Sequence, residues 1–169
     1  AVPVATPATF AANTGEVAAD AGSDLPQAIK TLVFAEVVNF RSIGEAQLSA
    51  FVHELRGEVA RLIGGLPVVP SVAETSAGSM FFVFDGLAEA ARLALDLRDM
   101  MVRGAWEKRG LPTNLSMRIA LHAGPVFSFA DPVTRRSSCL GAHLTRAQHI
   151  LPTVTPGQVY GSQEFAALC

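Results

Sequence analysis

The order of two kinds of apolar pattern constrains the fold of this chain more than any other feature. Thr31–Val38 is a nearly continuous apolar run of strand-forming residues, which is typical of a buried strand. Glu45–Ile63 then repeats apolar residues at spacings of three and four, which predicts an amphipathic helix. The same patterns predict further strands at Pro67–Glu74, Met80–Phe84, Leu115–His122, Val126–Ala130 and Gln158–Tyr160, and helices at Leu87–Arg103 and Ala142–Leu151.

Strands interleaved with helices in this order predict an α+β sandwich in which helices cover a sheet. A ferredoxin-like βααββαβ core is compatible with the order, although periodicity alone does not fix how the strands pair. Small residues at Thr75–Ser79 and at Ala123–Pro125 are expected to form the turns between paired strands. Asp85 is expected to be the N-cap of the helix at Leu87–Arg103.

Composition divides the chain into two parts. Residues 1–28 are rich in Ala, Pro, Thr, Gly and Asp and lack apolar periodicity, so we expect a linker or a disordered arm there. Residues 29–169 are expected to form one domain, because their number suffices for a sizeable single core.

The net charge limits which kinds of partner the protein is expected to bind, and the cysteine content indicates its cellular compartment. The formal net charge of −2 argues against a general affinity for nucleic acid or for anionic membranes. No apolar run reaches the roughly 18 residues that a membrane span needs. Cys139 and Cys169 form no metal-binding or disulfide pattern, so a reducing, cytoplasmic location is expected.

Four short motifs follow one another in a family-specific order. They lie at Phe34–Phe40, Ser116–Val126, Gly141–Ala147 and Pro156–Tyr160. They resemble the Phe-Ala-Asp-Ile-Val-Gly-Phe, Leu-Arg-Val-Gly-Ile-His-x-Gly-Pro-Val, Gly-Asp-Thr-Val-Asn-x-Ala and Pro-Gly-x-Ile/Val motifs of the nucleotidyl (adenylate/guanylate) cyclase catalytic domains. This resemblance covers almost the whole predicted domain and implies the fold of that family, with a nucleotide site formed between two such domains.

The resemblance implies where metal ligands would lie. In the family two aspartates hold two metal ions, which activate the ribose hydroxyl and bridge the phosphates. Glu36 falls at the first of these positions, and its carboxylate still suits a hard cation. Gly78 falls at the second, or Ser79 if the alignment slips by one residue, and neither is a carboxylate. Mg²⁺ or Mn²⁺ is therefore expected only if a nucleotide binds.

The resemblance also implies where the groups from the partner domain would lie. Thr145 falls at the position of an Asn that orients the ribose, and His149 at that of an Arg that stabilises the transition state. A histidine lacks the guanidinium fork and is mostly neutral at pH 7. Arg146, one helical turn earlier, is a possible substitute.

The base-selecting positions of the family correspond to Glu74 and Ser138. A Glu can accept hydrogen bonds from the N1 and amino edge of guanine, and a Ser can donate to its O6. If a purine binds, guanine is slightly favoured. The alternative interpretation is that Glu74 is a surface charge at the end of a strand.

Two other groups have simple structural interpretations. The spacing of His122, His143 and His149 matches no zinc signature. We therefore expect His122 to cap a strand and the other two to lie on a helix surface. Asp131–Arg136 is predicted to be a charged hairpin tip, whose arginines either are solvated or contact phosphates or an acidic partner.

Together these residues predict a degenerate cyclase-like domain without catalytic activity. It would act as a regulatory or dimerisation module in signal transduction, for example in bacteria, and could still bind a purine nucleotide. The alternative is an active purine nucleotide cyclase that uses Glu36, Arg146 and one metal ion. A third interpretation is a site with altered chemistry on a nucleotide. The expected partner is a second copy of the chain or another cyclase-like domain.

Overall fold

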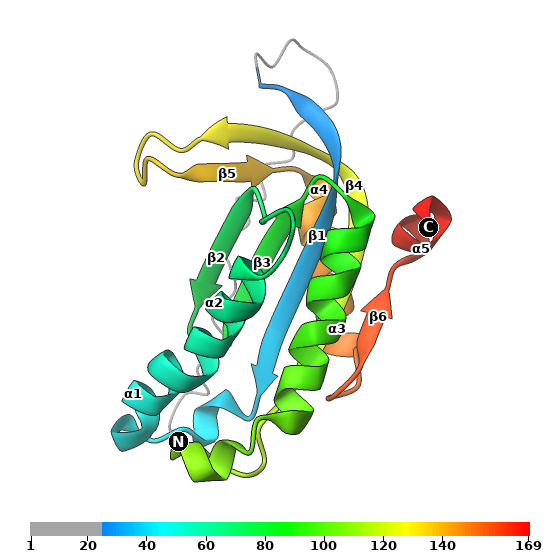
Figure 1. Cartoon of the computed structure of the whole chain (residues 1–169). Helices are drawn as coiled ribbons and strands as arrows, with labels where there is room; N and C mark the ends of the chain where they lie inside the picture. The colour runs from blue at the N-terminus through cyan, green and yellow to red at the C-terminus, as the bar shows by residue number, and fades with distance from the viewer. Residues whose placement is uncertain (1–24) are drawn as a thin grey trace, which may run out of the picture.

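The structure, a computed structural model, describes residues 25–169 as one α+β domain (Figure 1). The arm predicted at residues 1–28 lies mostly outside the described residues, and its last two, Gln27 and Ala28, already belong to the first strand. The strands are β1 (Gln27–Val38), β2 (Val72–Ser76), β3 (Ser79–Phe84), β4 (Ser116–Ala130), β5 (Ser137–Leu140) and β6 (Val159–Gly161). The α-helices are α1 (Leu48–Ala50), α2 (Gly57–Gly64), α3 (Leu87–Arg103), α4 (Ala142–Ile150) and α5 (Gln163–Leu168).

The strands form one sheet in the order β2-β3-β1-β4-β5, with β6 parallel to β4 and every other pairing antiparallel. The order β2-β3-β1-β4 is the ferredoxin-like arrangement that the sequence left open, so the predicted fold class is confirmed. β1 lies at the centre, and its buried stretch at residues 32–35 is entirely apolar because both of its faces are covered there.

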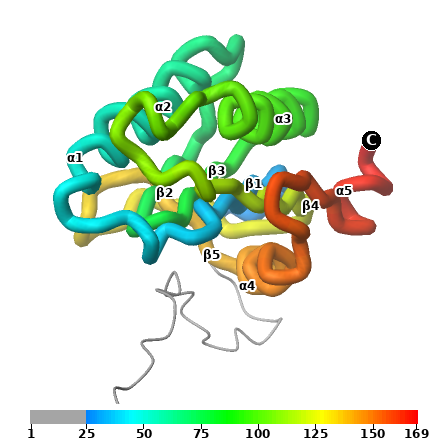
Figure 2. Tube along the Cα trace, turned by 90° about the horizontal axis from the view of Figure 1, so that it is seen from below, coloured from blue at the N-terminus to red at the C-terminus, as the bar shows by residue number. Residues whose placement is uncertain are grey.

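Helices cover both faces of this sheet (Figure 2). We call the side with α2 and α3 the α2–α3 face, and the opposite side the α4 face. Side chains alternate along β1, so Val33 and Ala35 belong to the core of the first face, and Leu32 and Phe34 to that of the second. The α2–α3 face has the larger core, which includes Leu55, Phe82, Leu93, Leu97 and Met117.

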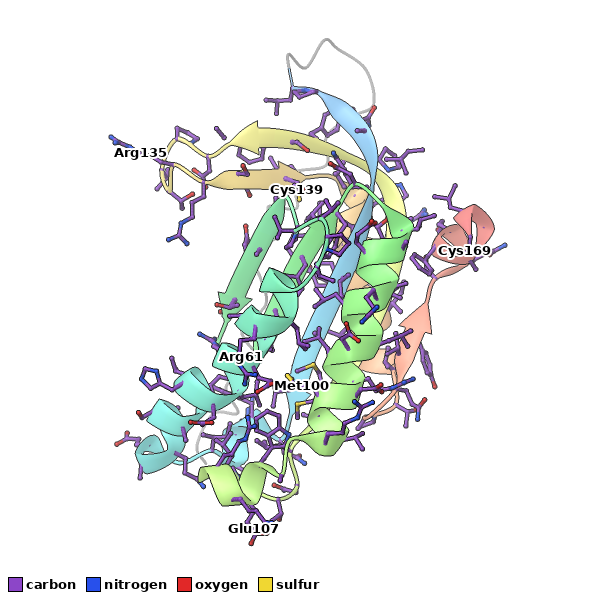
Figure 3. All side chains as sticks on the ribbon, viewed as in Figure 1. Arg61, Met100, Glu107, Arg135, Cys139 and Cys169 are labelled. Atoms are coloured by element: carbon purple, nitrogen blue, oxygen red, sulfur yellow. The ribbon has the colours of Figure 1, made fainter. Side chains whose placement is uncertain are left out.

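Strand β4 is long and bends, so that the hairpin it forms with β5 arches back across the sheet toward β2 (Figure 1). Cys139, which belongs to β5 of this arch, is buried together with Val72 of β2 in the α4-face core. The tip of the hairpin is the turn predicted at Asp131–Arg136, in which Asp131 accepts hydrogen bonds from the backbone N–H groups of Val133 and Thr134. Arg135 at this tip points away from the domain (Figure 3).

The structure differs from the predicted elements at the Ala123–Pro125 segment. We expected a turn there, but β4 continues through it, and Gly124 and Pro125 pair with Lys30 and Ile29 of β1. Proline lacks a backbone N–H and is tolerated where a strand is paired on one side only. Pro125 is such a position, because it pairs with β1, whereas the β6 pairing ends at Leu121 and the β5 pairing begins at Phe127. β1 begins four residues earlier than predicted and supplies the partners for this continuation.

The helices differ from prediction in three places. The predicted helix at Glu45–Ile63 is interrupted: a 3-10 turn at Glu45–Gln47 precedes α1, and a π-helical segment at Phe51–Arg56 precedes α2. The N-cap of α3 is Gly86, whereas Asp85 forms an ion pair with Lys30 of β1. Helix α5 was not predicted; its N-cap Ser162 accepts a hydrogen bond from the Phe165 backbone N–H.

Candidate functional site

Glu36 lies near the end of β1 on the α4 face, in alternation with Leu32 and Phe34. Its neighbours across the sheet are Ser79 of β3 and Arg118 of β4. The Arg118 Nε donates to a Glu36 carboxylate oxygen over 2.8 Å, and both side chains are 26% exposed. The carboxylate predicted to bind a metal ion is therefore already paired with a cation of the same chain.

Gly78 lies beside Glu36 in the β2–β3 turn, and its carbonyl oxygen accepts a hydrogen bond of 2.8 Å from the Val37 N–H. A Cβ atom added at Gly78 would lie 2.8 Å from the Phe40 Cγ, closer than real Cβ contacts. The Phe40 ring is itself held edge-to-face on the buried Phe51 ring, at 5.1 Å between centroids. The space for a side chain at position 78 is thus filled by an aromatic ring.

Arg56 holds the same turn from the helical side. Its guanidinium donates to the Ala77 carbonyl oxygen over 2.6 Å and lies over the Phe51 ring. These contacts fix the turn against the π-helical segment. The region offers one carboxylate, already in an ion pair, so its residues do not fit a site for two metal ions. Within Leu25–Cys169, no group of three or more His, Cys, Asp or Glu residues is arranged to hold a metal ion.

Glu74 and Ser138 are 64 residues apart, and the β4–β5 arch brings them together. The Ser138 hydroxyl donates to a Glu74 carboxylate oxygen at 3.5 Å, the outer limit of a hydrogen bond. Burial, followed by the nearby Glu74 carboxylate, raises the pKa of the Cys139 thiol to about 12. The two predicted base-selecting residues therefore form a polar pair between β2 and β5.

Helix α4 carries the three residues that were predicted to contribute to the site of a partner domain. Thr145 is half-buried, His149 is exposed, and Arg146 extends toward α5. An Arg146 guanidinium nitrogen lies 3.2 Å from a Glu164 carboxylate oxygen, and both side chains are largely exposed. Arg146 is therefore directed to the C-terminal helix of its own chain in this structure.

The histidines are not arranged as we expected. His122 caps no strand: it lies inside β4, is 0% exposed, and hydrogen bonds through both ring nitrogens. Its Nε2 lies 2.8 Å from the Nδ1 of His143, and its Nδ1 lies 2.8 Å from the Ser162 Oγ. His143 therefore packs into the domain, and only His149 lies exposed on the helix surface.

Four residues of this region were not identified from the sequence: Arg118, Phe40, Ser162 and Glu164. The alternation of β4 gave a usable signal for Arg118, since a lone Arg in an apolar strand indicates an acidic partner on a neighbouring strand. Ser162 before Gln163 and Glu164 has the pattern of an N-cap. The position of Phe40 over Gly78 depends on the irregular backbone after β1 and has no sequence signature.

Comparisons with known proteins give a consistent result for the fold. No protein-family model matches the sequence, and no curated protein sequence is similar to it. Among solved structures, the adenylyl cyclase CyaB from P. aeruginosa has a TM-score of 0.73 and 14% identity, covering 86% of this chain and 82% of that chain.

Two guanylyl cyclase domains are also similar. The GTP complex of the RhGC domain from Catenaria anguillulae has a TM-score of 0.70 and 19% identity, covering 85% of this chain and 83% of its own. A dimeric RhoGC domain from Blastocladiella emersonii has a TM-score of 0.70 and 18% identity, covering 84% of each chain. Similarity of this extent at such low identity establishes architecture, and the chain has the fold of the nucleotidyl cyclase catalytic domains.

Proposed function

We propose that this chain is a cyclase-like domain that has lost nucleotide cyclisation and acts as a regulatory or dimerisation module in signal transduction. The observation that carries this proposal is the β2–β3 turn, where the resemblance puts the family's second metal-binding aspartate at Gly78, or at Ser79 if the alignment slips by one residue. Gly78 has no side-chain ligand atom, and Phe40 fills the space that a side chain would need. The loss is therefore built into the packing around the residue.

The other positions support the same conclusion. Glu36 is paired with Arg118, so a metal ion would have to displace a guanidinium group before it could bind. The resemblance puts His149 at the position of the transition-state Arg, and Arg146 is paired with Glu164. Loss of single charge-stabilising groups of this kind costs enzymes several kcal/mol of transition-state stabilisation, on the order of 2.7–4 for one donor. Here such losses occur in both halves of the site.

A second candidate function, purine binding without turnover, is favoured by the Glu74–Ser138 pair. The fold brings these two residues, 64 positions apart in the chain, to the same place, so that both could contact one purine. A purine edge would have to replace this contact with its own hydrogen bonds. Guanine has donors for Glu74 and an acceptor for Ser138, so we propose GTP as the preferred nucleotide.

A second copy of the chain is the partner that we propose for the domain, since the family forms its site between two domains. The RhoGC domain, which has the same fold, is known both as a monomer and as a non-canonical dimer. Sedimentation at tens of micromolar tests this point. A sedimentation coefficient of a dimer is expected, and a monomer at that concentration would contradict it.

The function is tested by titrating the domain calorimetrically with ATP and with GTP, each with Mg²⁺ or Mn²⁺, and then separating the products by chromatography. We expect no cyclic nucleotide and no pyrophosphate. Heat from GTP that is lost in Glu74→Gln would assign purine binding, and no heat would leave dimerisation or regulation. Formation of a cyclic nucleotide would contradict the proposal and would make Glu36→Gln and Arg146→Gln the next variants.

A further inference from the structure

A polar cluster that extends from the interior of the α4 face (His122, 0% exposed) to its surface (Glu164, 41% exposed) has no role in the function proposed above. It contains His122, His143, Ser162 and Glu164, and His122 is its centre. Most buried side chains around it are apolar, including Leu32 of β1, which pairs with His122. A fully buried histidine with two partners is unusual in such a core and calls for a physical account.

His122 connects three elements of the chain. From β4, one ring nitrogen contacts His143 of α4, and the other contacts Ser162 at the N-cap of α5. The two imidazole rings are nearly parallel, with centroids 5.1 Å apart. Gly124 makes this approach possible, because a Cβ atom at that position would collide with the His143 ring. The sequence of β4 thus provides both the bonding partner and the space for it.

The hydrogen bonds place a limit on the protons that the pair can hold. Two nitrogens 2.8 Å apart share one proton, so one ring donates and the other accepts. If both rings became cationic, two N–H groups would face each other at this distance. The shared hydrogen bond would then be replaced by repulsion between like charges.

The surrounding charges oppose each other. Glu164 of α5 lies 3.7 Å from the His122 Nδ1 and favours a cation there, whereas Arg146 of α4 disfavours it. Leu32, the paired neighbour on β1, is apolar. Burial lowers the pKa of His122 most, against the opposing effect of Glu164. Burial and then Arg146 lower the pKa of His143.

We propose that the His122–His143 pair is an acid-released latch that holds α4 and the start of α5 on the sheet at neutral pH and releases them on acidification. Because the rings are held in their neutral form when folded, the opened state binds more protons than the closed state below the ordinary histidine pKa of about 6.5. The closed state is therefore fully favoured above that pH, and its advantage falls as the pH decreases. The released helix carries Thr145 and His149, so the latch would control the face on which the candidate site lies.

Hydrogen exchange measured by mass spectrometry tests the latch on the full chain. The opening constant of α4 is determined between pH 7.5 and 5.5, corrected for the intrinsic pH dependence of exchange, and compared with that of α3 in the same molecule. One proton taken up on opening changes the constant up to tenfold per pH unit, so we expect the α4 constant to rise about tenfold relative to α3. An unchanged ratio would overturn the proposal.

Variants separate the latch from general acid sensitivity. His122→Phe with His143→Phe keeps two stacked rings and removes both proton sites, so the α4-to-α3 ratio should become independent of pH. His149→Gln, on the exposed side of the same helix, should behave like the wild-type chain. If the double variant fails to fold, His143→Asn keeps a hydrogen-bonding group near the Nδ1 position and should reduce the pH dependence. The latch would be contradicted if the α4-to-α3 ratio of opening constants rose on acidification as much in the double variant, or in His143→Asn, as in the wild-type chain.

Discussion

The two faces of the sheet are held by different interactions. The α2–α3 face rests on a large apolar core in which α3 alone contributes Leu93 and Leu97, both 0% exposed. The α4 face has a smaller apolar core together with polar contacts: the Glu36–Arg118 pair, the Arg146–Glu164 pair and the histidine cluster. Every residue with a predicted site role, Gly78 apart, lies on or beside this second face or at its β2–β5 corner.

This difference assigns most of the folding stability to one face and the sensitivity to pH and salt to the other. Apolar burial is insensitive to pH and salt, whereas ion pairs and buried histidines respond to both. The α2–α3 face can keep the domain folded while contacts on the α4 face change with conditions. The predictions below test this separation, from the largest expected effect on stability to the smallest.

The largest effect is expected from Leu97→Ala on α3. It removes a fully buried side chain from the main core and leaves a cavity, which should cost about 3 kcal/mol of unfolding free energy. The loss should be the same at pH 5.5 and 7.5, measured by urea denaturation. Leu95→Ala on the same helix is the control, since Leu95 is 44% exposed and should change stability by about 0.5 kcal/mol or less. A strongly pH-dependent loss for Leu97→Ala would break the comparison of the two faces.

A smaller loss is expected from Gly78→Asp. The new Cβ would overlap the Phe40 ring, and such overpacking should cost about 1–3 kcal/mol. Adding Phe40→Ala should relieve part of the loss, which a double-mutant cycle measures. Once Glu36→Asp is added to this pair, Mn²⁺ binding becomes testable by calorimetry. If Gly78→Asp were as stable as the wild-type chain, the Phe40 ring would have to move aside at little energetic cost.

The Glu36–Arg118 pair should contribute modestly, because both side chains are partly exposed. A double-mutant cycle with Glu36→Gln and Arg118→Gln should give a coupling energy of about 0.5–1 kcal/mol. This coupling should fall in high salt. The Arg92–Asp96 pair on α3 is a matched control, with an expected coupling of about 0.3–0.5 kcal/mol. Equal couplings for the two pairs would remove the electrostatic distinction that we draw for the α4 face.

The smallest effect concerns thiol chemistry, which leaves stability unchanged. Cys139 is buried with its pKa raised to about 12, so its thiolate fraction at pH 8 is on the order of 10⁻⁴. Iodoacetamide should therefore modify native protein once, at the exposed Cys169, and urea-unfolded protein twice. Mass spectrometry counts the adducts. Rapid alkylation of Cys139 in native protein would mean that the β4–β5 arch separates from β2 and exposes this thiol.

Sequence periodicity predicted the regular elements well and the irregular ones poorly. Helix α3 has the predicted bounds, because its apolar spacing and the flanking glycines leave few alternatives. The continuation of β4 through Gly124–Pro125 was missed, because these residues are typical of turns and only their pairing with β1 keeps them extended. Such pairing depends on residues about 95 positions earlier in the chain.

The candidate site divides in the same way. Positions inferred from family motifs could be placed along the sequence, but their contacts could not. The approach of Glu74 to Ser138 depends on the bend of β4, and the pairing of His122 with His143 depends on a missing Cβ at Gly124. Local sequence encodes neither of these distances.

The β4–β5 arch also bears on how this domain avoids aggregation. An exposed edge strand can pair with the edge of another molecule, and this sheet ends in β2 on one side and in β5 and β6 on the other. The arch brings β2 and β5 to one corner, where Glu74 contacts Ser138. Each edge thus shields part of the other, and a charged side chain stands between them. Shortening the hairpin at Asp131–Arg136 would uncouple these edges and favour fibrous or domain-swapped assemblies over discrete dimers.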